Sequence, residues 1–571
     1  MAKKQAEEPV LSEEQLSKEF KEYSVAEFFK RNRQMLGYTG KVRSLTTVVH
    51  EFVSNSMDAT EDAGVLPEIL VEVDSLPNDH VKVVVEDNGT GIPRKNVGQA
   101  FGKLLAGTKF MQRKQKRGQQ GLGGSYCVLF AQITTGKETR VKTGTGDHKI
   151  YECDVSIDIN KNDAVIRNEK EYSGKFRGTR VELELAEVEY NRSSYSVYEY
   201  LRRTAVANPH AQITLVEPNK EITVFPRAST EIPKKPKNAL PHPLGLTTSD
   251  LIDLASKTEG RKISSMLQNE LSRVSGDKVK ELAALVKDVD LERSPKYLQW
   301  PEAEKIVKAF AQIKWIAPET DVLIPIGEKQ VEKSLKNLLQ PEELRIVERP
   351  PKVFKGGVAF AVEAAIAYGG KAGAPGSVGG SGNSEGGKAG KEVARATKGE
   401  LMRFANRVPL LFDAGADAIT EAVKTIDWNR YDLKDWESQP VTLFVNFTSV
   451  YVPYTGAGKL AIAQEEEIVA EIRYALMECA RGISTYLHHL KRAQEQEERR
   501  SLFFRYIPEI SQALSEITGK VQKEIAEKLR KIAEKRTQLA EAAEAGEDEE
   551  LDKIEKAAQK EMKESGEEEE E

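Results

Sequence analysis

Three polar side chains recur at helical spacing in an otherwise apolar stretch, Glu51-x-x-x-Asn55-x-x-Asp58. Spacings of four and three residues place them on one face of a helix. A carboxylate can activate a water, and carboxylate or amide oxygens can bind a hard cation. The surrounding apolar stripe consists of Leu45, Val48, Val49 and Phe52. Taken alone, this spacing is more often an ordinary solvated helix face, so the motif needs support from elsewhere in the chain.

A second motif, Asp87-Asn88-Gly89-Thr90-Gly91-Ile92, follows the strand-like run VKVVVE. A carboxylate at a strand end can accept a hydrogen bond from an exocyclic amine. Glycines beyond it, such as Gly91, let a ligand approach the backbone closely. An ordinary strand-to-loop turn has the same letters, so this motif is only moderately specific.

The third motif, here called the glycine segment, is Gly118-Gln119-Gln120-Gly121-Leu122-Gly123-Gly124. It precedes the apolar stretch SYCVLFAQI at 125–133. Backbone N–H groups of such a loop, together with the N-terminus of a following helix, bind polyphosphate oxygens. A lone G-x-x-G-x-G is weak, but the three motifs occur in one direction, and Arg177-Gly178-Thr179 follows them. Their joint occurrence by chance is improbable.

The elements that must position these motifs read as a mixed α+β pattern without a βαβ repeat. A helix is expected over 44–64, ending at Gly64 as a C-cap, and another over 24–36. Strands are expected at 68–76, 80–89, 139–158 and 179–185. A strand and a Pro/Lys-rich linker follow at 217–242, and short helices fill 247–312.

The second half of the chain returns to strand-like text and ends in helices. Strands are expected at 322–327, 352–370, 403–412 and 440–455. The Gly-rich stretch 369–390 reads as a flexible insertion and lacks the Lys-Ser/Thr pair of a phosphate loop. A long helix is expected over 461–505, then a Lys/Glu-rich helix over 511–543 and an acidic tail.

Composition narrows the class of protein. The chain has 571 residues, of which 39% are hydrophobic and 30% charged, with a formal net charge of −6. Residues 541–571 carry 15 acidic and 4 basic side chains, so the body of the chain is slightly basic. Cys127, Cys153 and Cys479 lie far apart, which excludes a disulfide scaffold. The sequence has neither a long apolar run nor an apolar N-terminal leader, so we expect a cytoplasmic protein without membrane contact.

The motif set resembles the Bergerat-fold ATPases, which include type II topoisomerases, the ninety-kilodalton heat-shock chaperone, sensor histidine kinases and mismatch-repair ATPases. Longer strings resemble the B subunits of archaeal-type DNA topoisomerase VI. These strings are SVAEFFKRNRQMLGYTGK, FGKLLAGTKF, RGQQGLGGS, RFANRVPLLF and TSVYVPYTGAGK. One departure is Gly124, where a β-branched residue is commoner in the family.

The resemblance implies a multidomain α+β fold. An N-terminal arm would span 1–22, and a Bergerat-fold domain with helices on one face of a mixed sheet would span 23–240. A helix-two-turns-helix module would occupy 241–312, and an α/β transducer domain with a long C-terminal helix would occupy 313–505. The helical and acidic tail would span 506–571 and include the docking site for a partner subunit.

The resemblance also implies roles in binding ATP and Mg²⁺. Glu51 would activate the attacking water, Asn55 would hold Mg²⁺, Asp87 would accept from adenine, and Gly91 would give the base room. The phosphate contacts would come from Thr108, Lys109, the glycine segment (Gly118, Gln119, Gln120, Gly121, Leu122, Gly123, Gly124), Ser125 and Thr179. Asp58 would buttress the helix or the base pocket. Lys459, in the turn Thr455-Gly456-Ala457-Gly458-Lys459, would sense the γ-phosphate and assist catalysis.

The implied partners are an A subunit in an A₂B₂ heterotetramer, a second B subunit when ATP binds, and double-stranded DNA. The DNA contact would involve the cations Lys257, Arg261, Lys262, Arg273, Lys278 and Lys280, although a mixed-charge solvated face explains these residues better. The segment SLFFRYIPEI (501–510) would dock to the A subunit, or form a local hairpin core. The rival interpretations are a chaperone-type or mismatch-repair-type clamp, a histidine kinase and a degenerate ATPase scaffold.

Overall fold

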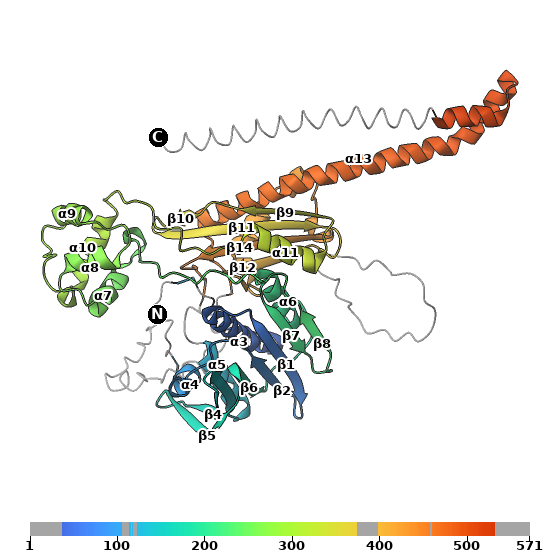
Figure 1. Ribbon diagram of the computed structural model, residues 1–571. Helices are drawn as coiled ribbons and strands as arrows, with labels where there is room; N and C mark the ends of the chain where they lie inside the picture. The colour runs from blue at the N-terminus through green and yellow to red at the C-terminus, as the bar shows by residue number, and fades with distance from the viewer. Residues whose placement is uncertain are drawn as a thin grey trace, which may run out of the picture. The chain divides into compact units, whose positions relative to one another are not determined.

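The computed structural model describes residues 37–104, 114–115, 117, 123–373, 398–456 and 460–531 (Figure 1). The chain divides into two compact units, residues 1–483 and 484–571, which are described separately. The expected helix at 24–36, most of the Gly-rich stretch at 369–390 and the acidic tail lie outside the described residues.

The first module is built on an eight-stranded sheet with the order β5-β4-β3-β6-β2-β1-β7-β8. β1 and β7 pair in parallel, and the other neighbours are antiparallel. Residues along β1, β2, β4 and β6 largely alternate between buried and partly exposed positions, so one face of the sheet carries the core. The strands are β1 (Glu68–Leu76), β2 (His80–Glu86), β3 (Thr139–Thr145), β4 (Lys149–Asp158), β5 (Asp163–Ser173), β6 (Arg177–Leu185), β7 (Gln212–Val216) and β8 (Ile222–Phe225).

Helices cover the buried face of this sheet, as Figure 1 shows. They are α3 (Lys41–Ala63), α4 (Arg94–Phe101), α5 (Gly123–Thr135) and α6 (Val197–Ala207). The predicted end of α3 is confirmed, because Gly64 adopts the left-handed conformation and caps the helix. The same apolar core holds side chains of α3, α5 and the sheet strands, which fixes the helix bearing Glu51 and Asn55 against the strands.

A small helical module with its own core follows, and it contains α7 (Thr248–Lys257), α8 (Ile263–Glu270), α9 (Gly276–Leu285) and α10 (Trp300–Phe310). Side-chain caps start two of these helices: Thr247 forms a capping box with Asp250, and the Ser275 hydroxyl accepts from the Lys278 backbone N–H. The prediction of short helices over 247–312 is confirmed.

The second sheet has the order β10-β11-β14-β12-β13, with β9 also paired to β11. Its strands are β9 (Glu343–Glu348), β10 (Lys352–Phe354), β11 (Val358–Tyr368), β12 (Glu400–Ala405), β13 (Val408–Pro409) and β14 (Val441–Ser449), and its helices are α11 (Glu328–Leu339), α12 (Ala418–Lys424) and α13 (Glu466–Thr518). β14 is buried along its whole length and β11 nearly so. Both faces are covered, as expected for strands that read as continuous apolar runs.

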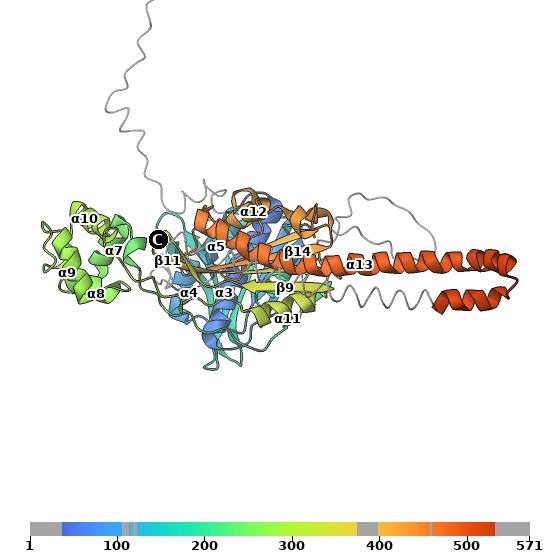
Figure 2. The ribbon, with the colours of Figure 1, turned by 90° about the horizontal axis from the view of Figure 1, so that it is seen from above.

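The start of α13 lies over this sheet in both ribbon views (Figures 1 and 2). The Arg349 guanidinium pairs with Glu471 at 2.7 Å, and the Cys479 thiol donates to the Ala364 carbonyl at 3.5 Å. Another core joins α11 and the sheet to Val206 and Ala207 of α6. The first sheet's helix layer therefore packs directly on the second sheet's module.

The expected strand at 322–327 is wrong. Pro325 lacks an N–H to donate, and the backbone groups beside it bond to side chains instead of to a strand. The Ile324 N–H and C=O both bond to the Gln115 carboxamide, and the Glu363 carboxylate accepts from the Ile326 and Gly327 N–H groups. The segment is therefore an extended connection held from outside.

The second unit contains the remainder of α13, which runs to Thr518, past the predicted end near 505. Gly519 has a φ of 67° and interrupts the helix, so the Lys/Glu-rich helix expected from 511 is divided here.

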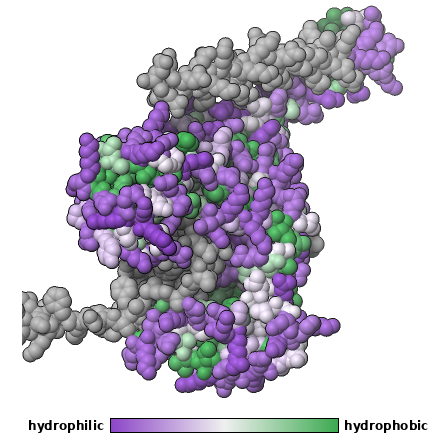
Figure 3. Space-filling view, turned by 60° about the vertical axis from the view of Figure 1, so that its left-hand side comes forward, coloured by the Kyte–Doolittle hydropathy of each residue, from purple (hydrophilic) through white to green (hydrophobic). Residues whose placement is uncertain are grey.

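Among the described helices, none combines the length and apolar character needed to cross a membrane. The face of the molecule in Figure 3 is mostly hydrophilic, with small separate hydrophobic patches.

Candidate active site

Glu51 and Asn55 lie on the partly exposed stripe of α3. Between residues 44 and 60, every position is buried except His50, Glu51, Asn55 and Ala59. Positions 51, 55 and 59 are four residues apart and share one face. Neither the Glu51 carboxylate nor the Asn55 carboxamide has a hydrogen-bond partner among the described residues. Two polar groups on one helix face are thus available to a ligand.

The third motif meets this stripe at Glu51. A Cβ built on Gly123 would lie 1.7 Å from Glu51 Oε2, so only glycine allows the carboxylate its present position. Gly123 begins α5, whose N-terminus favours negative charge. Gly124 is less constrained, because a Cβ there would make only ordinary contacts at 3.6 Å and beyond. Ser125 follows in α5 and is buried.

The second motif meets the other end of the stripe. The Asp87 carboxylate is buried and accepts from Ser56 Oγ at 2.8 Å, from the Gly89 N–H at 2.9 Å and from the Thr179 N–H at 3.2 Å. Burial raises the pKa of Asp87, against these three hydrogen bonds, which lower it. An ionised carboxylate has about four acceptor sites, so one remains for an outside donor.

The two ends are two helical turns apart. Gly89 lies against Ala59, since a Cβ on Gly89 would be 2.9 Å from the Ala59 Cβ. From residue 51 to residue 59, α3 rises about 12 Å. One face of α3 therefore runs from the Glu51 carboxylate, at the start of α5, to the buried and hydrogen-bonded Asp87 carboxylate, directly after β2.

Gly91 has a structural reason to be glycine. Its φ is +66°, and a Cβ there would lie 2.2 Å from the Gly144 carbonyl oxygen. The next N–H, that of Ile92, donates to Thr143 Oγ1 at 2.7 Å. The loop after Asp87 is thus packed directly on β3, and this packing by itself requires glycine at position 91.

Other predicted site residues lie outside the described part of the chain. These are Thr108, Lys109, Gly118, Gln119, Gln120, Gly121, Leu122 and Lys459. The residue that follows Lys459, Leu460, is described and lies near α3. Leu460 packs on the first core and lines a small cavity with Thr46 and His50. Burial, followed by the charge of Glu51, raises the pKa of Tyr454.

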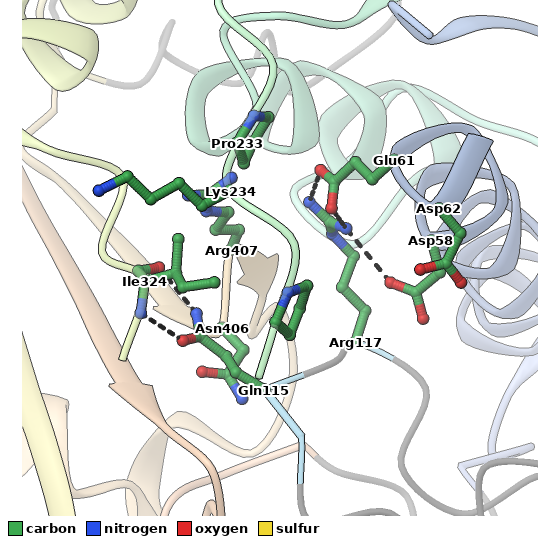
Figure 4. Close-up of a pocket in the computed structure, with 11 residues that line it drawn as sticks. Asp58, Glu61, Asp62, Gln115, Arg117, Pro233, Lys234, Ile324, Asn406 and Arg407 are labelled. Carbon is green, nitrogen blue, oxygen red and sulfur yellow. Dashed lines mark hydrogen bonds and ion pairs between the residues drawn. The ribbon is translucent and has the colours of Figure 1, made fainter. Parts of the chain in front are cut away.

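A buried ionic cluster that sequence reasoning missed lies beside the site (Figure 4). The Arg117 guanidinium donates to Glu61 at 2.7 and 2.9 Å, to Asp58 at 3.2 Å and to Asn208. His210 Nε2 lies 2.9 Å from Glu61 Oε1. Asp58, which we expected to buttress the helix or the base pocket, forms an ion pair with Arg117. The available signal was an arginine directly before the glycine segment.

Comparisons with known proteins found two family profiles and several solved structures that are similar to parts of this chain. A family profile described as "Histidine kinase-, DNA gyrase B-, and HSP90-like ATPase" matches residues 40–188, and one described as "Topoisomerase VI B subunit, transducer" matches residues 318–499. The B subunit of DNA gyrase from Myxococcus xanthus aligns with a TM-score of 0.38 at 10% identity, over 80% of this chain and 95% of that one. The ATPase region of Saccharomyces cerevisiae topoisomerase II gives the same score and identity over 83% and 99%.

Curated relatives match at much higher identity. The B subunit of type 2 DNA topoisomerase 6 from Thermococcus kodakarensis is 46% identical over 92% of this chain and 97% of its own length. The protein of the same name from Pyrococcus furiosus is 44% identical over the same shares. That of Methanothermobacter thermautotrophicus is 46% identical over 86% of this chain and 91% of its own length. The chain therefore belongs to the topoisomerase VI B subunit family, the ATPase subunits of type II DNA topoisomerases.

Proposed function

We propose that this chain binds and hydrolyses ATP·Mg²⁺ along the exposed stripe of α3, and that the nucleotide drives passage of one DNA duplex through another. The observation that carries the proposal is the shared face of α3, with Glu51 against Gly123 at one end and Asp87 at the other. The base lies at Asp87 and the last phosphate at Glu51. The membership of the chain in the topoisomerase VI B subunit family supports the DNA substrate.

Each end of the stripe has a defined chemical task. The free acceptor site of Asp87 takes a hydrogen bond from the adenine amino group, while Ser56, Gly89 and Thr179 keep the carboxylate in place. Glu51 takes the proton of the attacking water and orients it towards the γ-phosphate. The N–H groups at the start of α5 bind phosphate oxygens.

The donor set fits magnesium. Mg²⁺ is commonly held by one or two protein oxygens together with phosphates and waters. The described residues contain no group of three or more His, Cys, Asp or Glu that could hold a metal. The Asn55 carboxamide oxygen, with no described partner, is the ligand from α3. When bound, the ion neutralises charge on the phosphate oxygens.

Lys459 is assigned the role of γ-phosphate sensor. It is adjacent to Leu460, which packs on the core of the first module. Tyr454 forms an antiparallel bridge with Ile462, and the Thr455 N–H donates to the Ala461 carbonyl at 3.0 Å. This pairing of the described residues on both sides of Lys459 supports a lysine that the transducer presents to the γ-phosphate. Loss of that phosphate on hydrolysis removes the contact and frees the transducer to move.

The second unit provides a surface for the A subunit. Exposed apolar side chains follow each other at spacings of three and four residues along the end of α13, and they are Phe503, Tyr506, Ile510, Leu514 and Ile517. A stripe of this kind on a helix is typical of an interface. We assign it to the partner that cleaves DNA, in an assembly of two A and two B subunits.

The helical module is a weaker candidate for DNA contact. Lys262 pairs with Glu292, Lys278 with Glu281 and Lys280 with Asp277. Arg273 donates to the Ala317 carbonyl at 3.2 Å. Exposed ion pairs of this kind contribute little, so phosphates can replace the carboxylates, but the pairing itself favours a solvated face.

The test is ATP turnover by the purified chain. We expect Mg²⁺-dependent hydrolysis, dimerisation with a non-hydrolysable ATP analogue, and loss of turnover with retained binding in Glu51→Gln. The conservative change keeps the size of the side chain and removes its basicity. If Glu51→Gln turns over ATP at the wild-type rate, Glu51 is not the base. If the wild-type chain neither binds ATP·Mg²⁺ nor dimerises with the analogue, the proposal as a whole is wrong.

A further inference from the structure

A network of hydrogen bonds links Gln115 and Arg117, the described residues that lead into the glycine segment, to residues of the transducer. We call it the junction ring, and it comprises Gln115, Arg117, Asn208, Arg407 and the backbone of Ile324–Pro325. Gln115 Nε2 donates to the Ile324 carbonyl at 2.8 Å, and the Ile324 N–H donates to Gln115 Oε1 at 2.7 Å. Figure 4 shows four of these residues, Gln115, Arg117, Ile324 and Arg407, converging from separate segments of the chain.

The other side of the ring runs through Arg117. Its guanidinium donates to Asn208 Oδ1, and Asn208 Nδ2 donates to the Arg407 carbonyl at 3.2 Å. Arg407 Nη2 in turn donates to the Pro325 carbonyl at 2.9 Å, next to the residue that Gln115 holds. Two residues just before the glycine segment are therefore bonded, by opposite routes, to the transducer.

The side chains of the ring are buried, and ion pairs with Asp58 and Glu61 hold Arg117 in place. The side chain of Arg117 is only 6% exposed. Burial opposes its charge, but Glu61 and then Asp58 outweigh that effect and raise the pKa of Arg117. Residues of the ring line a cavity of about 30 Å³, together with Asp58 and Glu61. That volume holds about one water, so the cavity is no second nucleotide site.

The transducer side of the ring is strained. Asn406 and Arg407 form the two-residue turn between β12 and β13, with φ values of 49° and 67°. Such turns favour Asn-Gly, and a left-handed arginine costs free energy. The strain persists because Arg407 makes three bonds there, including that of its N–H to Asn446 Oδ1 at 3.1 Å. Strained backbone of this kind is concentrated at functional sites.

We propose that the junction ring couples occupancy of the nucleotide site to the transducer, with Gln115 and Arg117 as positioning residues. The inference rests on the proposed function, since it takes the glycine segment to bind the triphosphate. It adds a second route beside Lys459. Lys459 reports the γ-phosphate from the transducer side, whereas the ring connects the chain that leads into the phosphate loop to Ile324–Pro325 and to the β12–β13 turn.

The chain offers a closely matched control. Gln132 of α5 makes the same pair of hydrogen bonds to one backbone residue as Gln115. Its Nε2 donates to the Ile157 carbonyl at 3.0 Å, and its Oε1 accepts from the Ile157 N–H at 2.8 Å. Both partners of that pair of bonds lie within the first module. Gln115→Met and Gln132→Met therefore remove the same two bonds and keep similar volume, but only the first opens the ring.

The experiment is hydrogen exchange of the full chain with and without a non-hydrolysable ATP analogue and Mg²⁺. In the wild type and in Gln132→Met, we expect the analogue to change deuterium uptake of peptides containing Ile324. In Gln115→Met that response is lost, while the Kd for the analogue stays within about threefold, below the smallest typical allosteric coupling. Asn208→Asp, which keeps the acceptor for Arg117 and removes the donor to Arg407, reduces the response as well.

The outcomes separate the two proposals. An undiminished response in Gln115→Met would overturn the coupling role, and so would a wild-type chain that binds the analogue without any change at Ile324. Loss of the response in Gln132→Met as well would show that a general loss of stability, and not the ring, is responsible. Absence of analogue binding by the wild-type chain would refute the proposed function itself, and the inference with it.

Discussion

Gly123→Ala tests whether the position of the Glu51 carboxylate controls catalysis. The added Cβ would lie 1.7 Å from Oε2 and 2.4 Å from Cδ of Glu51. Ordinary contact begins at 3.4 Å, so the oxygen must retreat by about 1.7 Å, the difference between the two distances. Because the atom that moves is the end of a flexible side chain, the fold accommodates the added methyl group, but the Glu51 carboxylate is displaced from its present position.

The expected magnitudes separate activity from stability. A displacement of 1 Å or more in a positioned catalytic group costs about 10²-fold, so kcat should fall about 100-fold, or about 2.7 kcal/mol. Replacing glycine by alanine in a helix raises the free energy of unfolding by about 0.5–1 kcal/mol, and a distorted Glu51 rotamer lowers it by a similar amount. We therefore expect an almost unchanged Tm and a KM for ATP within about threefold of wild type.

The assay is steady-state ATP hydrolysis with thermal unfolding measured on the same preparations. Gly124→Ala is the comparison, because its Cβ would meet Ala100 and Phe101 at 3.6–3.9 Å and leave Glu51 in place. In a Glu51→Gln background, Gly123→Ala should cost little more, since both changes act on the same group. The reasoning would be refuted if kcat fell equally in Gly123→Ala and Gly124→Ala. It would also be refuted if Gly123→Ala lowered kcat by about a further 100-fold in the Glu51→Gln background.

Three further predictions concern other parts of the chain. Asp87→Asn should weaken ATP binding at least about tenfold. In the wild type, the affinity for ATP should also fall at low pH as Asp87 is protonated, at a pH above 3.8 because burial raises the pKa of Asp87, and the Asn variant should lack this fall. Calorimetric titration at several pH values checks both expectations. Burial lowers the pKa of His210 below 6.5, so the unfolded chain binds the extra proton and stability falls as pH drops below 6.5; His210→Asn should flatten the dependence of Tm on pH there, and an unchanged slope would contradict this assignment. The double change Phe503→Glu and Tyr506→Glu should abolish pull-down of the A subunit and leave ATP turnover by the isolated chain unchanged; retained pull-down would exclude the stripe as the docking surface.

The sequence alone was sufficient for features that depend on local order. The period of 3.6 residues put Glu51 and Asn55 on one face, and Gly64 ended their helix as predicted. The strand before Asp87 was equally clear, because alternating and β-branched runs carry their signal in neighbouring residues. Order and spacing of the motifs indicated a Bergerat-fold ATPase, and the longer strings resembled the topoisomerase VI B subunits, a family that the curated relatives confirm.

Only the tertiary structure decided which distant groups meet. Nothing in the local sequence shows that Gly123 must be glycine to leave room for Glu51, or that Arg117 is held by Glu61 and Asn208. The segment around Ile324 has the apolar letters of a strand, yet its backbone bonds to Gln115. The physical reason is that periodicity reports which face of an element is buried, whereas the partner of a buried polar group is chosen by packing between residues far apart in the chain.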